Sequence, residues 1–505
     1  MLARIPTSAV PELELKFQLG QGALEALVAF FSAYPSCVSE LHAIYFDTPG
    51  HTLRDGGFSL RVRRQGERYV QTLKHRAAGG LFERDEWEVE VPGAALNREA
   101  LASTPVSDVV ASEVLEVAFS VAVERRQILW AQGADEIEIS VDLGWIVAND
   151  RKEPVAEIEL ELLSGSTAAL FALAEQLQQT ADLTLSFESK AQRGYRLAGH
   201  DGVTALVARQ LAVGPGTSTA EAFRAIAREG LVQIAGNARL LQRSHNPEAL
   251  HQTRVGLRRL RAAMTVFESL LDPVGLSQAR RETRWLGREL SPARDLDALL
   301  ARIATTDGID DSPGRAAFLS ALRLAQAEAY EKALTALGSP RYRALLLMLG
   351  QWIEVGAWTH DMSSGVAETS VEVVAAPVLH RLHRRLGRGL RKFRELTPEA
   401  RHDLRKKAKT LRYASAFVGD VFDRHPGRRE RYVAALRELQ DQLGTLNDIS
   451  VARALAKKTV GRRGGEMAFA AGLEIGRMSA DEAQILRIAT KTVRNYRKRR
   501  AFWTD

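Results

Sequence analysis

The hydrophobic pattern of this 505-residue chain changes its period near residue 200, and this change constrains the fold more than any other feature. Before it, short runs such as FSLRVRRQ and DEIEISVD alternate apolar with polar residues, as β-strands do. After about residue 218, long segments rich in Ala, Leu, Arg and Glu indicate helices. We therefore expect an α+β chain of two domains, a mostly antiparallel β domain followed by an all-helical one.

A stretch that contains glycine and proline joins the two expected domains. Residues Gly199–Ser218 include VGPGTSTA, which is typical of a linker that leads into a capped helix. We therefore place the first domain at residues 1–199, the linker at 200–217 and the second domain at 218–505. A chain of this length is too long for one ordinary hydrophobic core, which agrees with the division.

The charge balance indicates an anionic partner. The formal net charge is +7 and the pI is about 9.5, which suits nucleic acid, anionic lipid or a phosphate polymer. Cys37 is the single cysteine, so no internal disulfide can form, which fits a reducing compartment. The sequence has no apolar run of about 18 residues and no N-terminal apolar segment of signal-peptide length. We therefore expect a cytoplasmic protein without a membrane span.

Charged residues occupy alternate positions in most of the expected strands. On one strand alone, such a face is most simply a solvent-exposed surface. Several such strands together favour a sheet that closes around a polar interior, with helices near Gly22–Phe31 and Ser166–Thr180 covering the apolar outer face. The charged faces carry Glu12, Glu14 and Lys16; Arg61 and Arg63; Arg68, Thr72 and Lys74; Arg84, Glu86 and Glu88; Glu136, Glu138 and Asp142; and Glu157, Glu159 and Glu161.

An interior of this kind would suit one particular chemistry. Arginine and lysine side chains can clamp the oxygens of a polyanion, and clustered carboxylates suit Mg²⁺ or Mn²⁺. A metal ion that bridges phosphate oxygens opposite guanidinium groups accelerates phosphoryl transfer. The sequence has no GxxxxGK[ST] motif, so a nucleotide P-loop is not expected.

These segments resemble the CYTH superfamily, whose members are also called triphosphate tunnel metalloenzymes. The resemblance covers about residues 10–197 and begins with ELELK, the ExExK signature of that family. It continues through the RVR pair, the TLK lysine, GGLFERDEWEVE, EIEISVD, EIELELLSG and a closing SKAQRGY, and it is strongest to bacterial inorganic triphosphatases. It implies an eight-stranded antiparallel β tunnel with flanking helices that hydrolyses inorganic triphosphate with Mg²⁺ or Mn²⁺.

The resemblance also implies a role for each charged position. The implied metal ligands are Glu12, Glu14, Asp142, Glu157, Glu159 and Glu161, with Asp142 and the later glutamates supporting a second metal ion or the attacking water. The implied ligands of the phosphate oxygens are Arg63, Lys74, Arg84, Arg125 and Lys190, together with Lys16 and Arg61. The expected catalytic residues are Lys16, Arg61, Glu159 and Glu161.

Two of these assignments stay open in the sequence. Only two of Glu157, Glu159 and Glu161 match the family's metal-binding pair, and a two-residue register separates the options; we favour Glu159 and Glu161. Arg125 adjoins Arg126, and the two side chains of a strand point to opposite faces.

The helical half contains an internal repeat. The segments HQTRVGLRRLR, from His251, and HDLRKKAKTLR, from His402, each place basic residues at +3, +7 and +10 after a histidine. This spacing aligns the four side chains on one helical stripe, which a solvated helix face or a bound anion would explain. Because the stripe occurs twice, an anion site is favoured. The two stripes are His251, Arg254, Arg258 and Arg261, and His402, Arg405, Lys409 and Arg412.

Two later segments match at nearly the same offset from each histidine. They are LSPARDLDAL, with Arg294 and Asp295, and LGTLNDISVA, with Asn447 and Asp448. The repeat predicts two related helical bundles. A transition-metal site is the less favoured alternative, because only one histidine leads each motif.

This half resembles the CHAD domain over about residues 218–500, through HQTRVGLRRLRA, RDLDAL, SPRYRALLLML, HDLRKKAKTLRYA and LNDISVA. The resemblance implies two pseudo-symmetric four-helix bundles that bind polyphosphate through the two stripes. Further basic residues would widen the anionic track: His380, Arg381, His383, Arg384, Arg385, Arg388, Arg391, Lys392 and Arg394.

The sequence therefore predicts a metal-dependent inorganic triphosphatase fused to a polyphosphate-binding domain, either held at polyphosphate granules or supplied with short chains. One alternative is a non-catalytic polyphosphate-binding or granule-associated protein. Another is a nucleotide-using CYTH enzyme, such as an adenylate cyclase or a thiamine triphosphatase. Nucleic acid is not the expected partner, because the basic motifs lack interleaved aromatic residues.

Overall fold

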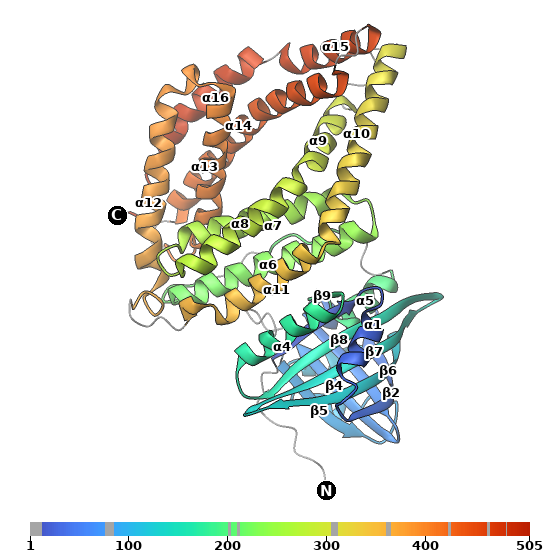
Figure 1. Ribbon diagram of the computed structural model, residues 1–505. Coiled ribbons are helices and arrows are strands. Elements are labelled where there is room, and N and C mark those ends of the chain that lie inside the picture. Colours follow the sequence, from blue (N-terminus) through green and yellow to red (C-terminus); the bar gives the residue numbers. More distant parts are fainter. Residues whose placement is uncertain are drawn as a thin grey trace. The chain divides into compact units, whose positions relative to one another are not determined.

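The computed structural model forms two compact units (Figure 1), which are Met1–Leu206 with Arg343–Val355, and Val207–Tyr342 with Gly356–Asp505. Each unit is described by itself. The structure describes residues 13–75, 85–199, 204–209, 213–304, 312–359, 365–422, 426–461, 465–480 and 482–504.

An antiparallel sheet dominates the first unit. The strands run in the order β5-β4-β3-β2-β6-β7-β8-β1-β9, and every neighbouring pair is antiparallel. The expected antiparallel β domain is confirmed, with eight longer strands and the three-residue β9. The strands are β1 (Glu14–Leu19), β2 (Ser36–Asp47), β3 (Phe58–Gln65), β4 (Arg68–His75), β5 (Asp85–Val91), β6 (Glu116–Gln132), β7 (Asp135–Ala148), β8 (Arg151–Ser164) and β9 (Leu183–Leu185).

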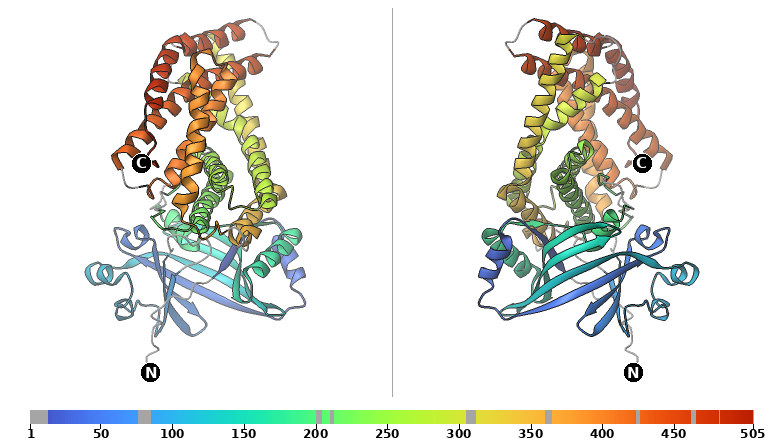
Figure 2. Two further views of the ribbon diagram at one scale, coloured as in Figure 1. Left: turned by 90° about the vertical axis from the view of Figure 1, so that its left-hand side faces the viewer. Right: turned by 90° about the vertical axis from the view of Figure 1, so that its right-hand side faces the viewer.

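The sheet curls back on itself (Figure 2), and charged side chains of its distant strands interact across the inner side. Lys74 on β4 acts electrostatically on Glu161 on β8, although β3, β2, β6 and β7 lie between these strands in the sheet. Arg125 on β6 acts in the same way on Arg63 on β3. Side chains on distant strands can interact like this only if the sheet bends back on itself.

Short helices cover the outer, apolar face of the sheet. Leu15, Phe17, Ile158 and Leu160 on β1 and β8 are fully buried, and α4 packs against β8 and α1. A second apolar cluster joins β3, β4 and β5 to α2, η1 and α3. These helices are α1 (Ala23–Phe30), α2 (Thr52–Asp55), η1 (Glu99–Leu101), α3 (Ser107–Ser112) and α4 (Thr167–Thr180).

The helix α5 (Lys190–Leu197) packs against the inner face of the sheet, which the sequence did not predict. Ala191 and Tyr195 join an apolar cluster with residues of β2, β6, β7 and β8. One end of the interior is therefore apolar, and the polar site occupies the remainder. Ser189 begins α5 with a capping box, which fixes where Lys190 leaves the helix.

The second unit is all-helical, as expected. Ser218 begins α6 with a capping box to Glu221, so the predicted capped helix is confirmed. Among the described residues, no helix is both long enough and apolar enough to cross a membrane. The helices that follow α5 in the chain are α6 (Thr219–Arg243), α7 (Pro247–Val266), α8 (Pro273–Glu289), α9 (Ser291–Ala304), α10 (Pro313–Leu337), α11 (Pro340–Val355), η2 (Ala357–Thr359), α12 (Val371–Gly389), η4 (Leu390–Glu395), α13 (Pro398–Phe417), α14 (Pro426–Val460), α15 (Glu466–Ala480) and α16 (Glu482–Arg497). Of α11, the part Arg343–Val355 belongs to the first unit.

The internal repeat maps onto equivalent helices with one local difference. The stripes lie on α7 and α13, which pack against each other. The partner segment of the first copy is split between α8 and α9, whereas the second copy has one continuous α14. Pro292 stands at the break, where it removes a backbone donor and favours a helix start, and Thr445 takes the matching place in α14.

Gly194 allows α5 to approach the sheet closely. A Cβ atom at this position would lie 2.2 Å from atoms of the Phe119 ring. We expect Gly194→Ala to lower the free energy of unfolding of the first unit by about 1–3 kcal/mol. Urea unfolding should show an earlier transition. Gly93→Ala, where nothing lies within 4 Å, is the control, and equal transitions for the two variants would contradict the packing argument.

Candidate functional site

The pairing register arranges the polar interior in three tiers across β1, β8 and β7. In the first tier Glu14 faces Glu161, which faces Glu138. In the second tier Lys16 faces Glu159, which faces Ser140. In the third tier Gln18 faces Glu157, which faces Asp142, and Asp142 faces Arg125 on β6. Because facing residues on one side of a sheet are neighbours, each tier is a group of adjacent side chains.

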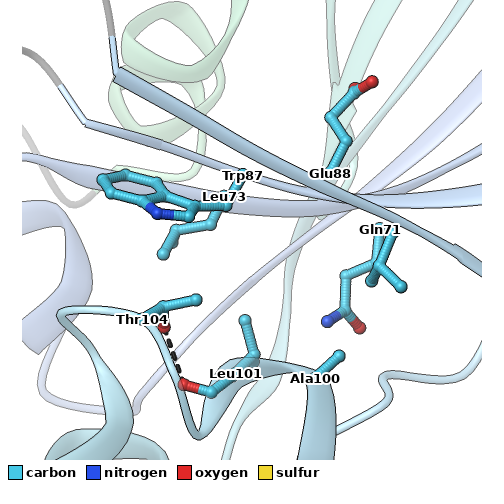
Figure 3. Close-up of a pocket in the computed structure, with 8 residues that line it drawn as sticks. Gln71, Leu73, Trp87, Glu88, Ala100, Leu101 and Thr104 are labelled. Carbon is cyan, nitrogen blue, oxygen red and sulfur yellow. Dashed lines mark hydrogen bonds between the residues drawn. The ribbon is translucent and has the colours of Figure 1, made fainter. Parts of the chain in front are cut away.

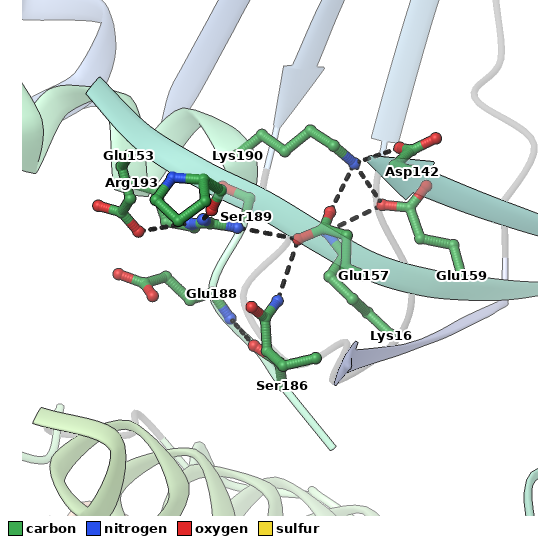
Figure 4. A network of polar contacts seen from close by, with 12 residues as sticks. Lys16, Asp142, Glu153, Glu157, Glu159, Ser186, Glu188, Ser189, Lys190 and Arg193 are labelled. Atoms are coloured by element: carbon green, nitrogen blue, oxygen red, sulfur yellow. Dashed lines mark hydrogen bonds and ion pairs between the residues drawn. The ribbon is translucent and has the colours of Figure 1, made fainter. Parts of the chain in front are cut away.

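The third tier is closed by an ammonium group from α5 (Figure 4). Lys190 Nζ lies 2.7 Å from Asp142 Oδ2, 2.5 Å from Glu157 Oε1 and 3.1 Å from Glu159 Oε1. Arg125 makes a bidentate contact with Asp142 at 2.7 and 2.6 Å and reaches Glu159 at 2.9 Å. Lys16 Nζ lies 3.1 Å from Glu159. Three cations from β1, β6 and α5 thus neutralise three carboxylates.

These contacts keep the buried carboxylates charged. Burial would raise the pKa of Glu159, but Lys190, Lys16 and Arg125 more than offset it and hold that pKa well below its usual value. The pKa of Asp142 is lowered in the same way, with burial opposed by Lys190 and Arg125. The pKa of Lys190 rises well above its usual value, because Asp142, Glu157 and Glu159 outweigh its burial.

Arg193 contacts Glu157 from the other side; it lies in the SKAQRGY segment, but the sequence did not predict a role for it. Its side chain is 1% exposed. Its guanidinium donates to Glu153 at 2.8 Å, to Glu157 Oε2 at 3.1 Å and to the carbonyl of Pro154. Gln18 also donates to Glu157 Oε2, at 3.0 Å. The position of Glu157, and through it Lys190, is therefore fixed by a fully buried ion pair.

The first tier is electrostatically different. Burial, followed by the carboxylates of Glu138 and Glu14, raises the pKa of Glu161. Lys74 is the cation that acts on Glu161 from across the interior, and it also pairs with Glu86 at 2.8 Å. Like-charged carboxylates that face each other destabilise a sheet unless a cation is shared between them. Their oxygen atoms are the donors that a hard divalent cation prefers.

Two arginines of β3 face the same interior without full hydrogen bonding. The Nε atoms of Arg61 and Arg63 are buried and have no hydrogen-bond partner among the described residues. Arg61 contacts the hydroxyl of Tyr45 at 3.5 Å, and Arg63 lies 3.9 Å from Glu88. Burial, followed by the neighbouring Arg61, lowers the pKa of Arg63. A buried guanidinium donor without an acceptor is costly, so these two donors could take an anion as a partner.

The structure thus brings together most of the residues predicted for the tunnel. Lys16, Arg61, Arg63, Lys74, Arg125 and Lys190 share the interior with Glu14, Asp142, Glu157, Glu159 and Glu161. Arg125 faces inward, whereas Arg126 reaches Ser36 on the exposed side. Glu12 and Arg84 lie outside the described residues. Within the described chain, the group of carboxylates close enough to share a cation is Asp142, Glu157 and Glu159.

Four further interior residues had no predicted role. Glu138, Glu86 and Glu88 lie on charged faces that the alternation had identified, and only the fold shows which residues they meet. Tyr45 lies on β2. The segment SELHAIYFD of this strand has no clear charged face, so the alternation of the sequence did not identify Tyr45 as an interior residue. Burial would raise the pKa of Tyr45, but Arg61, Lys190 and Lys74 lower it overall.

A small pocket elsewhere in this unit has a different character (Figure 3). It lies between the outer side of β4 and β5 and the η1 segment. Its lining is mostly apolar, and in Figure 3 the carboxylate of Glu88 points away from it. We regard it as a packing gap. The lining residues are Gln71, Leu73, Trp87, Glu88, Val89, Ala100, Leu101 and Thr104.

The helical unit brings the centres of the two stripes together. Arg254 and Arg258 on α7 act electrostatically on Arg405 and Lys409 on α13. Asp448 lies 3.8 Å from Arg405. Asp295 is the matching acid of the first copy, and burial raises its pKa against the opposing effect of Arg254. We call Arg254, Arg258, Arg405 and Lys409 the cationic cluster; four cations there meet two carboxylates.

The arginines of this cluster also have unused donors. The Nε atoms of Arg254, Arg258 and Arg405 are buried and have no hydrogen-bond partner in the part of the chain that the structure describes. Burial is the main cause that lowers the pKa of Arg254 to about 10. This is the same feature that Arg61 and Arg63 show in the tunnel, and it indicates an anion that would accept these hydrogen bonds.

The ends of the stripes do not join the cluster. Arg261 lies near Arg280 and Arg284 of α8, and Arg412 donates to Gln440 at 2.7 Å. The prediction that all four residues of each stripe act together therefore applies to its central part. A helical stripe rotates away from its partner helix along its length, which explains the difference.

The two histidines have different partners. Arg294 Nε donates to His251 Nδ1 at 3.1 Å, which requires that this nitrogen carry no proton. Burial, followed by Arg294 and Arg258, lowers the pKa of His251 to about 4. The Nδ1 atom of His402 instead contacts the side-chain oxygen of Asn447, which requires a proton there. Among the described residues, neither histidine belongs to a group that could hold a metal ion.

Comparison with known proteins identifies both units. The model of the CYTH domain matches residues 11–195, and the model of the CHAD domain matches residues 225–457. The chain is therefore a fusion of a CYTH domain and a CHAD domain.

Individual relatives match one or both domains. The inorganic triphosphatase of Haemophilus influenzae is 32% identical over 167 residues, which are 32% of this chain and 46% of that protein, so the match spans about half of the relative's length. The uncharacterized protein MT2285 of Mycobacterium tuberculosis is 25% identical over 81% of this chain and 82% of its own. The solved CHAD domain of the plant Ricinus communis has a TM-score of 0.50 and 28% identity, covering 58% of this chain and 97% of that structure.

The contrast between the first and third tiers predicts opposite effects of two glutamate substitutions. Glu157→Gln leaves the buried Lys190 and Arg193 short of a charge, so we expect a loss of about 3–5 kcal/mol in the free energy of unfolding. Glu161→Gln removes a like-charge repulsion, so without metal we expect a gain of up to about 1 kcal/mol. Urea unfolding in EDTA measures both. Similar losses for the two variants would show that the tiers do not differ.

Proposed function

We propose that the CYTH domain hydrolyses inorganic triphosphate with a bound divalent cation. The observation that carries this proposal is the pair of buried, unpartnered Nε donors of Arg61 and Arg63, which face an acidic tier across the same interior. A bare carboxylate ligand would satisfy the arginines but would be repelled by Glu161 and Glu138. A phosphate anion that carries a divalent cation would interact favourably with both the arginines and the acidic tier.

We assign the cation to the first tier. The carboxylates of Asp142, Glu157 and Glu159 lie closer to one another, but Lys190, Lys16 and Arg125 already neutralise them. Glu14 and Glu161, with Glu138 beside them, would hold Mg²⁺ or Mn²⁺, and Glu12 is a further expected ligand. Of the candidate ligands Glu157, Glu159 and Glu161 on β8, Glu161 is the one not engaged by Lys190, Lys16 or Arg125 among the described residues, which favours it over Glu157 as a ligand. When bound, the cation would neutralise charge that develops on the phosphate oxygens.

The basic residues then divide into two groups by their present partners. Arg61, Arg63 and Lys74, on β3 and β4, would bind the phosphate oxygens most directly. Arg125, Lys190 and Lys16 are held in place by Asp142, Glu157 and Glu159, so they would meet the substrate as positioned charges with little reorganisation. Glu159, kept ionised by these cations, is placed to orient an attacking water.

The comparison with a relative of named activity concerns this domain alone. The Haemophilus influenzae relative is an inorganic triphosphatase, and its match to this chain supports triphosphate as the substrate. Adenylate cyclase or thiamine triphosphatase activity would need a site for a base at the mouth of the interior.

Adjacent arginines on β3 provide a matched test. Arg63 faces the interior, whereas Arg64 is exposed and donates to the carbonyl of Gly66. We expect Arg63→Ala to lower kcat/KM for triphosphate on the order of 100- to 1000-fold, and Arg64→Ala to change it less than about threefold. Phosphate release should require Mg²⁺ or Mn²⁺ and should fall strongly in Glu161→Gln.

The substrate panel contains triphosphate, long polyphosphate, ATP and thiamine triphosphate, each with Mg²⁺ and with Mn²⁺. Faster turnover of ATP or thiamine triphosphate would contradict the proposal in favour of a nucleotide-using or thiamine-using enzyme. Absence of phosphate release from every compound would leave a protein that only binds the anion.

We further propose that the CHAD domain binds inorganic polyphosphate at the cationic cluster. The support is the excess of cations over carboxylates there, together with the buried Nε donors of Arg254, Arg258 and Arg405. A chain of phosphates can accept from all three guanidinium groups at once. Such binding would suit a cytoplasmic protein held at polyphosphate granules, or one whose tunnel receives short chains.

A double substitution in the cluster tests this binding. We expect Arg258→Ala with Arg405→Ala to weaken polyphosphate binding and to reduce the dependence of log Kd on log salt by about 2, because two phosphate contacts are lost. Lys406→Ala is the control, since Lys406 is exposed and pairs with Asp403 at 3.1 Å. Fluorescence anisotropy of the full chain with labelled polyphosphate in EDTA measures both, and an unchanged salt slope in the double variant would contradict the site.

A further inference from the structure

Lys409 is the one amine of the cationic cluster, whose other three members are arginines. It forms no hydrogen bond and no ion pair within 4 Å to any residue that the structure describes, and its side chain is partly buried. The two lysines before it on α13 are exposed, and Lys406 has a partner in Asp403. Lys409 is therefore an amine held inside a basic site without a carboxylate of its own.

Positive charge surrounds Lys409 from both helices that bear the repeat. Arg405 precedes it by one turn on α13, and Arg254 and Arg258 act on it from α7. Asp448 on α14 is the acid that acts on it, and this carboxylate lies 3.8 Å from Arg405. His251, also on α7, adds no charge near neutral pH, because burial, Arg294 and Arg258 lower its pKa to about 4.

This environment favours the neutral amine. Burial, followed by Arg405 and Arg258, lowers the pKa of Lys409 to about 7. A lysine beside other cations in a partly desolvated site is a stronger nucleophile near pH 7 than an exposed lysine, because a larger fraction carries a free electron pair. The three neighbouring arginines would at the same time bind the phosphate group of a reactant.

We propose that Lys409 is an acylation site, which reacts with small acyl phosphates that bind by their phosphate group to Arg254, Arg258 and Arg405. The inference rests on the proposed anion binding at the cationic cluster and adds a covalent step to it. Acyl phosphates combine the anion that the arginines would hold with a carbonyl carbon that an amine attacks.

The step balances without a further reactant. The Lys409 nitrogen attacks the acyl carbon and forms a carbon–nitrogen bond, while the bond between that carbon and the phosphate oxygen breaks. Inorganic phosphate leaves with the electron pair, and the nitrogen loses one proton to water. The product is a neutral amide. The amide can no longer take up a proton when a polyanion binds, so acylation would weaken the binding of polyphosphate at the same place.

Labelling of the full chain with acetyl phosphate tests the proposal. Peptide mass spectrometry would follow acetylation of Lys409, Lys406 and Lys407 in one sample, so the two exposed lysines of the same helix are internal controls. At pH 7.5 we expect Lys409 to react on the order of 10-fold faster than either control. The ratio of the rate at Lys409 to the rates at the two controls should fall as the pH rises well above 7, because Lys409 then gains little further neutral amine.

Two further measurements separate capture of the phosphate from simple reactivity of the amine. The rate at Lys409 should saturate with acetyl phosphate and fall when inorganic phosphate or polyphosphate is added. With p-nitrophenyl acetate, which has no phosphate, it should not saturate. In Arg258→Ala, the rate with acetyl phosphate should fall at least about threefold, because a phosphate ligand and a neighbouring positive charge are both lost.

The outcomes distinguish this inference from the proposed binding of polyphosphate. Equal rates at Lys409, Lys406 and Lys407 in a protein that binds polyphosphate would overturn the acylation site and keep the binding site. Saturable labelling of Lys409 in a protein that does not bind polyphosphate would support the acylation site and contradict the proposed ligand. Fast but unsaturable labelling with acetyl phosphate would overturn the inference, since it requires capture of the phosphate.

Discussion

The ammonium of Lys190, held between Asp142, Glu157 and Glu159, is the interaction on which the tunnel site depends. Asp142 and Glu157 are fully buried, and buried carboxylates of this density are tolerable only when cations neutralise them. Because α5 carries Lys190, the same contact joins the last helix of the domain to the interior of the sheet. Arg193, one turn further along α5, donates a hydrogen bond to the other carboxylate oxygen of Glu157. The ion pairs that hold α5 against the sheet are thus the same ones that position the charged side chains of the site.

This internal neutralisation gives the interior two ends with different properties. Near α5 the charges are matched, so that end is fixed and rigid. Towards Glu14, Glu138 and Glu161 the carboxylates repel, and the Nε donors of Arg61 and Arg63 have no acceptor among the described residues. The proposed substrate, a phosphate chain that carries a divalent cation, would interact favourably with both groups, whereas a single ion of either sign would interact favourably with only one.

The helical domain uses a related arrangement on a different fold. Each copy of the repeat supplies two of the four cations of the cluster, and the packing of α7 against α13 brings like charges together. Such packing costs free energy unless an anion compensates for it. The copies are also not equivalent. His251 accepts a hydrogen bond from Arg294, whereas His402 contacts Asn447. In addition, Lys409 occupies the position where the first copy has Arg258. The exchange of one arginine for lysine places a titratable amine in a site that is otherwise always charged.

The sequence by itself determined the fold classes, the face on which each strand carries its charges, and the two helices that bear the repeat, because alternation and helical spacing are local properties of the chain. It also placed Arg125 next to Arg126 without choosing between them. Only the tertiary structure decided that Arg125 faces inward, that α5 enters the interior and that Glu157 and Glu159 are neutralised while Glu161 is not. It also decided that Lys409 has no hydrogen-bond or ion-pair partner among the described residues. The physical reason is that the charge state and availability of a group depend on distances of a few ångströms to residues far away in the sequence, which a periodic pattern does not encode.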